Sequence, residues 1–376
     1  MIRAACYLFL LGLLAPDTSY MHVRGGLDRV TRKLRDHQPV TVAFLGGSLT
    51  YNPGWRDKVC TYLRERWPRE HFRFIAAGIP SLGSVPHAFR LQRDVLDSGR
   101  VDLLFVETAV NDRVNGTDST DQVRALEGIV RRALPSADIV MMAFADPDKT
   151  PVEIGNQEKI AEHYHLPSLD IAQEVHDRIQ KGEFSWEKDF KDIHPAEFGQ
   201  ELYFESIRAL LEACWKRQPG QRAPMAAPID PDNFSRGTYV DVAEAGHDPR
   251  WTLDTAWTPK DSAGTRPGFV HVPVLEADTP GAGLTLAFTG TAVGIAVVSG
   301  PDAGTITYAV DQWPPRTMNL NTKWSAHLHL PWYEVLEGGL EPGPHVLHLS
   351  VGAGAVRIVH FLVNGPPARH YLHRKH

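Results

Sequence analysis

Short apolar runs alternate with amphipathic stretches over the first half of the chain, and each run ends in glycine or in polar residues. The runs are Val40–Leu45, Phe72–Gly78, Val101–Glu107 and Asp138–Phe144. Runs without an exposed polar face are typical of strands that are buried on both sides of a parallel sheet. The segments between and around them, such as 21–37, 55–66 and 123–133, carry apolar residues at helical spacing. This alternation predicts a doubly wound α/β fold, with helices on both faces of a parallel sheet.

The helical pattern stops at a stretch rich in proline and alanine between Pro219 and Pro231. Beyond it, short β-type runs are separated by Gly, Pro and Asp turns, which predicts an all-β sandwich. A chain of 376 residues is also long enough for two domains. We therefore predict an N-terminal extension at 1–21, an α/β domain at 22–217, a linker at 218–231, a β-sandwich domain at 232–367 and a tail at 368–376.

Charge and cysteine content narrow the classes of function. A net charge of −6 and a pI near 6.3 argue against a general nucleic-acid-binding protein, which is usually basic. The three cysteines lie far apart and lack the spacing of metal ligands. Neither a disulfide framework nor a zinc site is therefore indicated.

An apolar run at residues 4–15 follows Arg3 and is too short to span a bilayer. It is similar to the hydrophobic region of a signal peptide, although Leu14-Ala15-Pro16-Asp17 makes a poor cleavage site. The alternative is that the run forms the first strand or helix of the folded protein. The first interpretation predicts a secreted or periplasmic protein and the second a cytoplasmic one; neither includes a stable membrane span.

Polar residues follow several of the predicted strands. Ser48 comes after Gly46-Gly47, Gly78 ends the second run, and Asn111-Asp112 follows the third. The carboxyl ends of parallel strands meet at one edge of a sheet, where ligands bind in open α/β folds. His194 lies just before the last helical segment and completes a set that suits acyl transfer: a hydroxyl, a base and fixed N–H donors. Alternatively, Ser48 caps a helix and the others are turn residues.

These residues occur in four short motifs that resemble the sequence blocks of the SGNH hydrolases, also called GDSL-like esterases. The resemblance covers roughly residues 22–216, and it departs from the family pattern at three positions. Gly46-Gly47-Ser48-Leu49 resembles Gly-Asp-Ser-Leu with Gly47 for Asp, Gly78 matches the second block, Ala109-Val110-Asn111-Asp112 resembles Gly-x-Asn-Asp with Ala109 for Gly, and His194-Pro195 resembles Asp-x-x-His-Pro with Lys191 for Asp.

The resemblance implies a flavodoxin-like three-layer fold and assigns roles to residues of this chain. Ser48 would be the nucleophile and His194 the general base, without a metal or an organic cofactor. The N–H groups of Ser48 and Gly78 and the side chain of Asn111 would line the oxyanion hole.

The residue that orients the imidazole stays open, because Lys191 replaces the expected aspartate. Asp192 is the first candidate and Asp189 the alternative. A third possibility is a backbone carbonyl near Trp186, with Ser48 and His194 acting as a dyad.

Aromatic residues are concentrated in the middle of the β-rich half. We predict that Trp324 and Trp332 contact the substrate, since aromatic faces stack on sugar rings. The alternative is that they fill the core or the interface between the domains. In architecture, this half resembles the jelly-roll accessory modules found beside carbohydrate-active enzymes.

Together these features predict a serine esterase that hydrolyses small acyl esters, acetyl first among them, on carbohydrate. The expected partner is an acylated carbohydrate or another small ester, and no nucleic acid. One alternative is a lipase, lysophospholipase or thioesterase acting on a lipid-like acyl ester. Another is a non-catalytic carbohydrate-binding protein that retains the fold.

Overall fold

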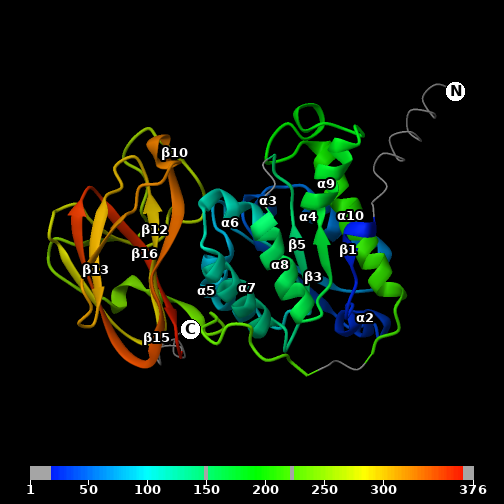
Figure 1. Cartoon of the computed structure of the whole chain (residues 1–376), viewed down its shortest axis with the longest axis horizontal. Helices are drawn as coiled ribbons and strands as arrows, with labels where there is room; N and C mark the ends of the chain where they lie inside the picture. Colours follow the sequence, from blue (N-terminus) through cyan, green and yellow to red (C-terminus); the bar gives the residue numbers. More distant parts are fainter. Residues whose placement is uncertain (1–17, 148–150, 221–223, 367–376) are drawn as a thin grey trace.

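The computed structural model describes residues 18–147, 151–220 and 224–366 and contains an α/β domain followed by a β domain (Figure 1). The apolar run at 4–15 and the tail at 368–376 lie outside the described residues. None of the described helices is long and apolar enough to cross a lipid bilayer. The exact limits of the domains and of the linker stay a prediction.

The first sheet confirms the predicted parallel fold. Its strand order is β1-β6-β5-β4-β2-β3, in which all neighbours are parallel except β1, which runs antiparallel to β6. Without β1, this is the flavodoxin-like order, whose switch point lies between β2 and β4. Ser48 follows β2 directly and so lies at that switch point. The strands are β1 (Met21–His22), β2 (Val40–Gly46), β3 (Phe72–Gly78), β4 (Leu103–Glu107), β5 (Asp138–Ala143) and β6 (Ser168–Asp170).

Helices cover both faces of this sheet because successive strand residues point to opposite sides. Helices α2, α4, α9 and α10 share one hydrophobic cluster with residues such as Val42 and Phe44. Helices α5, α7 and α8 share another with Ala43 and Leu45. The helices are α2 (Asp28–Arg35), α3 (Ser48–Tyr51), α4 (Trp55–Arg66), α5 (Ser84–Asp94), α6 (Ala109–Asn115), α7 (Ser119–Ala133), α8 (Pro151–His163), α9 (Ile171–Gln180) and α10 (Glu197–Lys216).

The prediction of a helix over 21–37 is wrong in its first part. Met21 and His22 form the edge strand β1, and the helix begins only at Asp28. Between them, Gly26 adopts a φ of +71°, a left-handed conformation that suits glycine and interrupts a helix.

The second half of the chain folds into the predicted antiparallel β structure. Its sheet has the order β14-β13-β15-β12-β16-β11-β9, with β7 on β16 and β8 on β12, while the short β10 pairs in parallel with β15. The strands are β7 (Gly237–Asp241), β8 (Gly246–His247), β9 (Thr252–Asp254), β10 (Gly264–Thr265), β11 (Val274–Ala277), β12 (Gly283–Ser299), β13 (Thr305–Val310), β14 (Arg316–Asn319), β15 (Leu328–Ala353) and β16 (Val356–Asn364).

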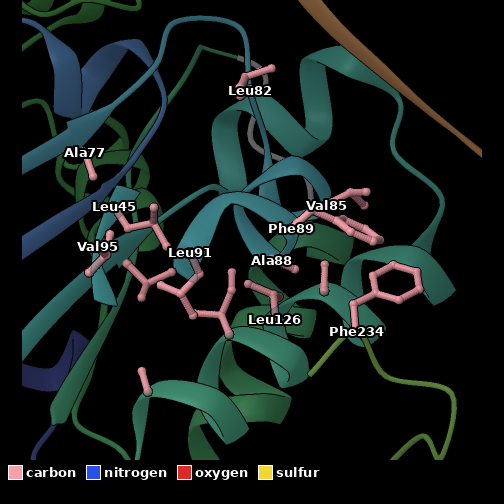
Figure 2. Close-up of a cluster of buried hydrophobic side chains, with 14 of the residues drawn as sticks. Leu45, Ala77, Leu82, Val85, Ala88, Phe89, Leu91, Val95, Leu126 and Phe234 are labelled. Carbon is pink, nitrogen blue, oxygen red and sulfur yellow. The ribbon is translucent and has the colours of Figure 1, made fainter. Parts of the chain in front are cut away.

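The two domains share one hydrophobic cluster. In the second half of β12, Val293, Ile295 and Val297 face the core of the β domain, whereas Ala296 and Val298 belong to the cluster that contains Leu45. Figure 2 shows part of this shared cluster around α5, where the rings of Phe89 and Phe234 lie 5.1 Å apart. Such continuous apolar packing fixes the β domain against the face that α5 and α7 cover.

Candidate active site

Ser48 and His194 lie in direct contact although 146 residues separate them in the sequence. Ser48 is the first residue of α3, and His194 belongs to the loop that precedes α10. The Ser48 Oγ lies 2.8 Å from the His194 Nε2. With the proton of the neutral imidazole on Nδ1, the hydroxyl donates to Nε2, which is the arrangement that general-base activation of a serine requires.

Gly47 is the residue that the chain has in place of the family's aspartate, and the structure gives a steric reason for its small size. A Cβ atom built on Gly47 would lie 2.0 Å from the Oδ1 of Asn111. The absence of a side chain therefore lets the amide of Asn111, which is only 6 % exposed, lie against the residue that precedes Ser48. Asn111 is the third residue of α6, and Ala109 begins that helix.

Gly78 at the end of β3 is packed against the first turn of α3. A Cβ atom on Gly78 would lie 2.4 Å from the backbone nitrogen of Tyr51. The next residue, Ile79, donates its N–H to the carbonyl of Gly46 at 3.0 Å. The structure therefore brings Ser48, Gly78, Asn111 and His194 to one edge of the sheet, as the sequence predicted.

The loop after β3 is tied to α6 by buried hydrogen bonds. Asp112 accepts from the backbone N–H of Ser84 at 2.8 Å and from its hydroxyl at 3.0 Å. The side-chain amide of Asn115 donates to the carbonyl of Ser81 at 2.8 Å. These bonds hold Gly78 and Asn111 in a fixed relation to one another.

The two carboxylates proposed to orient His194 occupy different environments. The Asp192 Oδ1 lies 3.8 Å from the His194 Nδ1, beyond hydrogen-bond distance, and its side chain is 68 % exposed. The same oxygen accepts the backbone N–H of His194 at 3.2 Å. Asp189 instead accepts the backbone N–H of Ser185 at 2.8 Å, within its own turn. Trp186 starts that turn and stacks on Phe190.

Burial and two charges act on the imidazole of His194. Partial burial lowers the pKa of His194 below its ordinary value, the carboxylate of Asp192 opposes this shift, and the guanidinium of Arg266 adds to it. An imidazole with a lowered pKa is neutral at pH 7 and is therefore ready to accept a proton.

A buried carboxyl group, that of Glu107, lies beside the end of the strand that precedes Ser48. Glu107 ends β4 beside Gly46, and its Oε2 accepts from the Thr50 hydroxyl at 3.4 Å. Its Oε1 has no hydrogen-bond partner among the described residues. Burial raises the pKa of Glu107 to about 8 and that of nearby Asp112 to about 7.

The substitution Glu107→Gln is expected to stabilise the fold, and increasingly so as the pH rises. The folded protein retains the proton of Glu107 up to a pKa of about 8, whereas in the unfolded chain the carboxyl group loses it near its ordinary pKa of 4.5. Between pH 4.5 and about pH 8, Glu107 therefore carries a proton in the folded state and has lost it in the unfolded state. The contribution of this group to the free energy of unfolding thus falls as the pH rises through this range. Urea denaturation at pH 5, 7 and 9 measures the difference. A difference independent of pH contradicts the expectation, and the exposed Glu244→Gln is the control.

The β domain reaches this edge of the sheet through the loop after β10. Gly268, at a φ of +118°, lies so close to Ile79 that a Cβ atom there would be 2.7 Å from the Ile79 Cγ2. Arg266 lies two residues earlier, and its backbone N–H donates to the backbone carbonyl of His329 at 2.8 Å. Sequence reasoning missed this loop because it carries no motif and lies far along the chain from Ser48.

The two tryptophans predicted to contact substrate differ in exposure. Trp324 is 42 % exposed, with the Lys323 ammonium 4.9 Å from its ring centroid. Trp332 is half-buried against the core of the β domain and donates its indole N–H to Glu334 at 3.0 Å. Within the described residues, no group of three or more His, Cys, Asp or Glu side chains is arranged to hold a metal ion.

Comparisons with known proteins agree with this architecture. Residues 44–202 match the model of the GDSL-like Lipase/Acylhydrolase family. No curated protein matches the chain by sequence.

Two solved structures resemble the chain over nearly its whole length. A two-domain esterase (CEX) active on acetylated mannans has a TM-score of 0.77 and 18 % identity, covering 93 % of this chain and 98 % of that chain. The same esterase co-crystallized with mannopentaose gives a TM-score of 0.76, with the same identity and coverage. At this identity, the likeness establishes a shared two-domain fold. Residues 44–202, within the α/β domain, thus form a GDSL-like lipase/acylhydrolase domain.

Proposed function

We propose that the protein is a serine esterase that removes small acyl groups, acetyl first among them, from carbohydrate. The observation that carries the proposal is the 2.8 Å contact between the Ser48 Oγ and the His194 Nε2 at the switch point of the sheet. Ligands of open α/β folds bind at such points. The close packing of Asn111 on Gly47 adds an amide beside the residue that precedes Ser48.

In this proposal, Ser48 attacks the acyl carbonyl while His194 takes the hydroxyl proton at Nε2. The N–H groups of Ser48 and Gly78 and the amide of Asn111 stabilise the negative charge that develops on the carbonyl oxygen. His194 then donates its proton to the departing sugar oxygen, which leaves an acyl-enzyme. Water, activated by His194, hydrolyses that ester and restores the serine.

Two observations favour an acylated carbohydrate over a lipid-like ester. The fold of both domains is shared with an esterase described as active on acetylated mannans. In addition, Trp324 is exposed at the start of the short turn that leads into β15, whose first residues pair with β10. We propose that the ring face of Trp324 not covered by Lys323 stacks on a sugar.

Release of acetate from a panel of substrates tests the proposal. The panel contains acetylated mannan, acetylated xylan, p-nitrophenyl acetate and p-nitrophenyl palmitate, each with wild type and Ser48→Ala. We expect acetate from at least one polysaccharide with wild type only. Hydrolysis of the palmitate ester alone assigns the chain to the lipase class, and activity that survives in Ser48→Ala removes the proposed mechanism.

Replacing Asp192 with asparagine is expected to lower kcat/KM much less than the roughly 10⁴-fold seen when a tightly bonded acid is lost from a catalytic triad. The reason is its 3.8 Å separation from the His194 Nδ1 and its exposure to water. Since Asp192 raises the pKa of His194, its loss moves the acid limb of the pH–rate profile to lower pH. Asp189→Asn is the matched control, because that carboxylate bonds to Ser185 instead. If kcat/KM falls more in Asp189→Asn than in Asp192→Asn, then Asp189 and not Asp192 is the carboxylate that acts on His194.

A further inference from the structure

Arg266 is a basic residue that the β domain places beside the candidate active site. Its backbone is fixed, because Gly264 and Thr265 pair with the first residues of β15 and the Arg266 N–H bonds to the carbonyl of His329. Two residues later, Gly268 packs against Ile79, the neighbour of Gly78. The loop that carries Arg266 therefore lies over the strand end that contributes Gly78.

The guanidinium of Arg266 is half-buried but has no ion-pair or hydrogen-bond partner among the described residues. Burial lowers its pKa, and no carboxylate opposes that shift. Two arginines that are more deeply buried than Arg266 have carboxylate partners: Arg357 binds Asp302 and Glu276, and Arg90 binds Asp94. Removing a charge from water without a partner costs free energy, so such a group is retained where a ligand supplies the partner.

The packing of Gly268 on Ile79 brings the charge of Arg266 near enough to act on His194. The guanidinium acts electrostatically on the imidazole and lowers its pKa. Coulomb interactions fall off with distance and are screened by water, so the two groups face the same region. A planar guanidinium suits carboxylate and sulfate oxygens, which accept two parallel N–H bonds from it.

We propose that Arg266 forms a subsite for an oxyanion, a carboxylate or a sulfate, that the acylated carbohydrate carries close to its ester group. The inference rests on the proposed esterase function and narrows its substrate class from acylated carbohydrates in general to those that carry an acidic group. The β domain thereby contributes a specificity-determining side chain to a reaction whose proposed catalytic and oxyanion-hole groups all come from the α/β domain.

Competitive inhibition of p-nitrophenyl acetate hydrolysis tests this subsite without requiring a carbohydrate ester. The inhibitors are glucose, glucuronate and glucose 6-sulfate, which share one ring and differ in charge. A charge-assisted hydrogen bond contributes about 1.5–3 kcal/mol, so at least one anion is expected to have an inhibition constant about tenfold or more below that of glucose. Tighter binding of glucuronate indicates that the substrate carries a uronate, and tighter binding of glucose 6-sulfate indicates a sulfated sugar. Equal constants for all three overturn the proposal.

Variants of Arg266 link the preference to this side chain. Arg266→Met is expected to remove the anion preference, and Arg266→Lys to retain part of it. The acid limb of the pH–rate profile should move to higher pH in Arg266→Met, because a charge that lowers the pKa of His194 is gone. Arg250→Met is the control, since Arg250 is exposed in the β domain and paired with Asp248. An anion preference that survives in Arg266→Met overturns the assignment.

The two proposals fail in different ways. If p-nitrophenyl acetate is hydrolysed but no polysaccharide releases acetate, the carbohydrate esterase proposal fails. The inhibition constants of the three sugars still test whether Arg266 binds an oxyanion. If acetylated polysaccharides are substrates and glucose inhibits as well as the anions, the esterase proposal stands and the oxyanion subsite does not exist.

Discussion

Alanine at Ser48 or at His194 is expected to lower kcat by about a thousandfold or more, and the double variant is expected to lose no more than either single one. The hydroxyl and the imidazole lie 2.8 Å apart. In the proposed mechanism they act as a unit, because a serine is a weak nucleophile until a base takes its proton. In a variant that already lacks one of these side chains, removal of the other is therefore expected to cause no further loss of kcat.

Rates of p-nitrophenyl acetate hydrolysis by the two single variants and the double variant measure this coupling. Circular dichroism and melting temperatures confirm that each variant is folded. Ser136→Ala is the matched control, because Ser136 lies between α7 and β5, at the opposite edge of the sheet. Losses that multiply in the double variant would show that Ser48 and His194 act independently, against the proposed mechanism.

Local sequence patterns were sufficient to predict the α/β domain. Buried parallel strands need apolar residues on both faces, so Val40–Leu45 and Leu103–Glu107 stand out from the amphipathic helices around them. Ser48, Gly78 and Asn111 follow strand ends, and parallel strands bring their carboxyl ends to one edge. Contact between Ser48 and His194 followed from the motif order, and their catalytic roles stay a prediction.

Features that depend on tertiary packing could not be predicted from local sequence patterns. Residues 283–288 and 292–298 read as two separate β-type runs in the sequence, but they form one strand, β12. A register shift between Gly290 and Ala292, typical of a β-bulge, lets the chain bend without leaving the sheet. Arg266 lies in a loop without a motif, and only the packing of Gly268 on Ile79 brings it to the site. The orienting carboxylate also depends on loop conformation: Asp192 and Asp189 have similar sequence contexts but different partners.

Alanine at Gly78 is expected to cost both stability and activity. The added Cβ would lie 2.4 Å from the nitrogen and 2.7 Å from the Cα of Tyr51, and 2.8 Å from the carbonyl carbon of Thr50. These are backbone atoms of α3, which cannot move without displacing Ser48 at the start of the same helix. Overpacking of this kind costs about 1–3 kcal/mol. A shift of about 1 Å at a reacting group lowers the rate about a hundredfold, so both effects are expected together.

Chemical denaturation and p-nitrophenyl acetate kinetics measure the two effects on the same samples. Gly155→Ala is the matched control, since nothing lies within 4 Å of a Cβ atom there and the residue is exposed inside α8. That change is expected to leave kcat unaltered and to stabilise the fold by up to about 1 kcal/mol, because glycine weakens a helix interior. If Gly78→Ala keeps wild-type kcat at pH 7, then α3 tolerates the displacement, and the close packing of Gly78 on Tyr51 is not what positions Ser48.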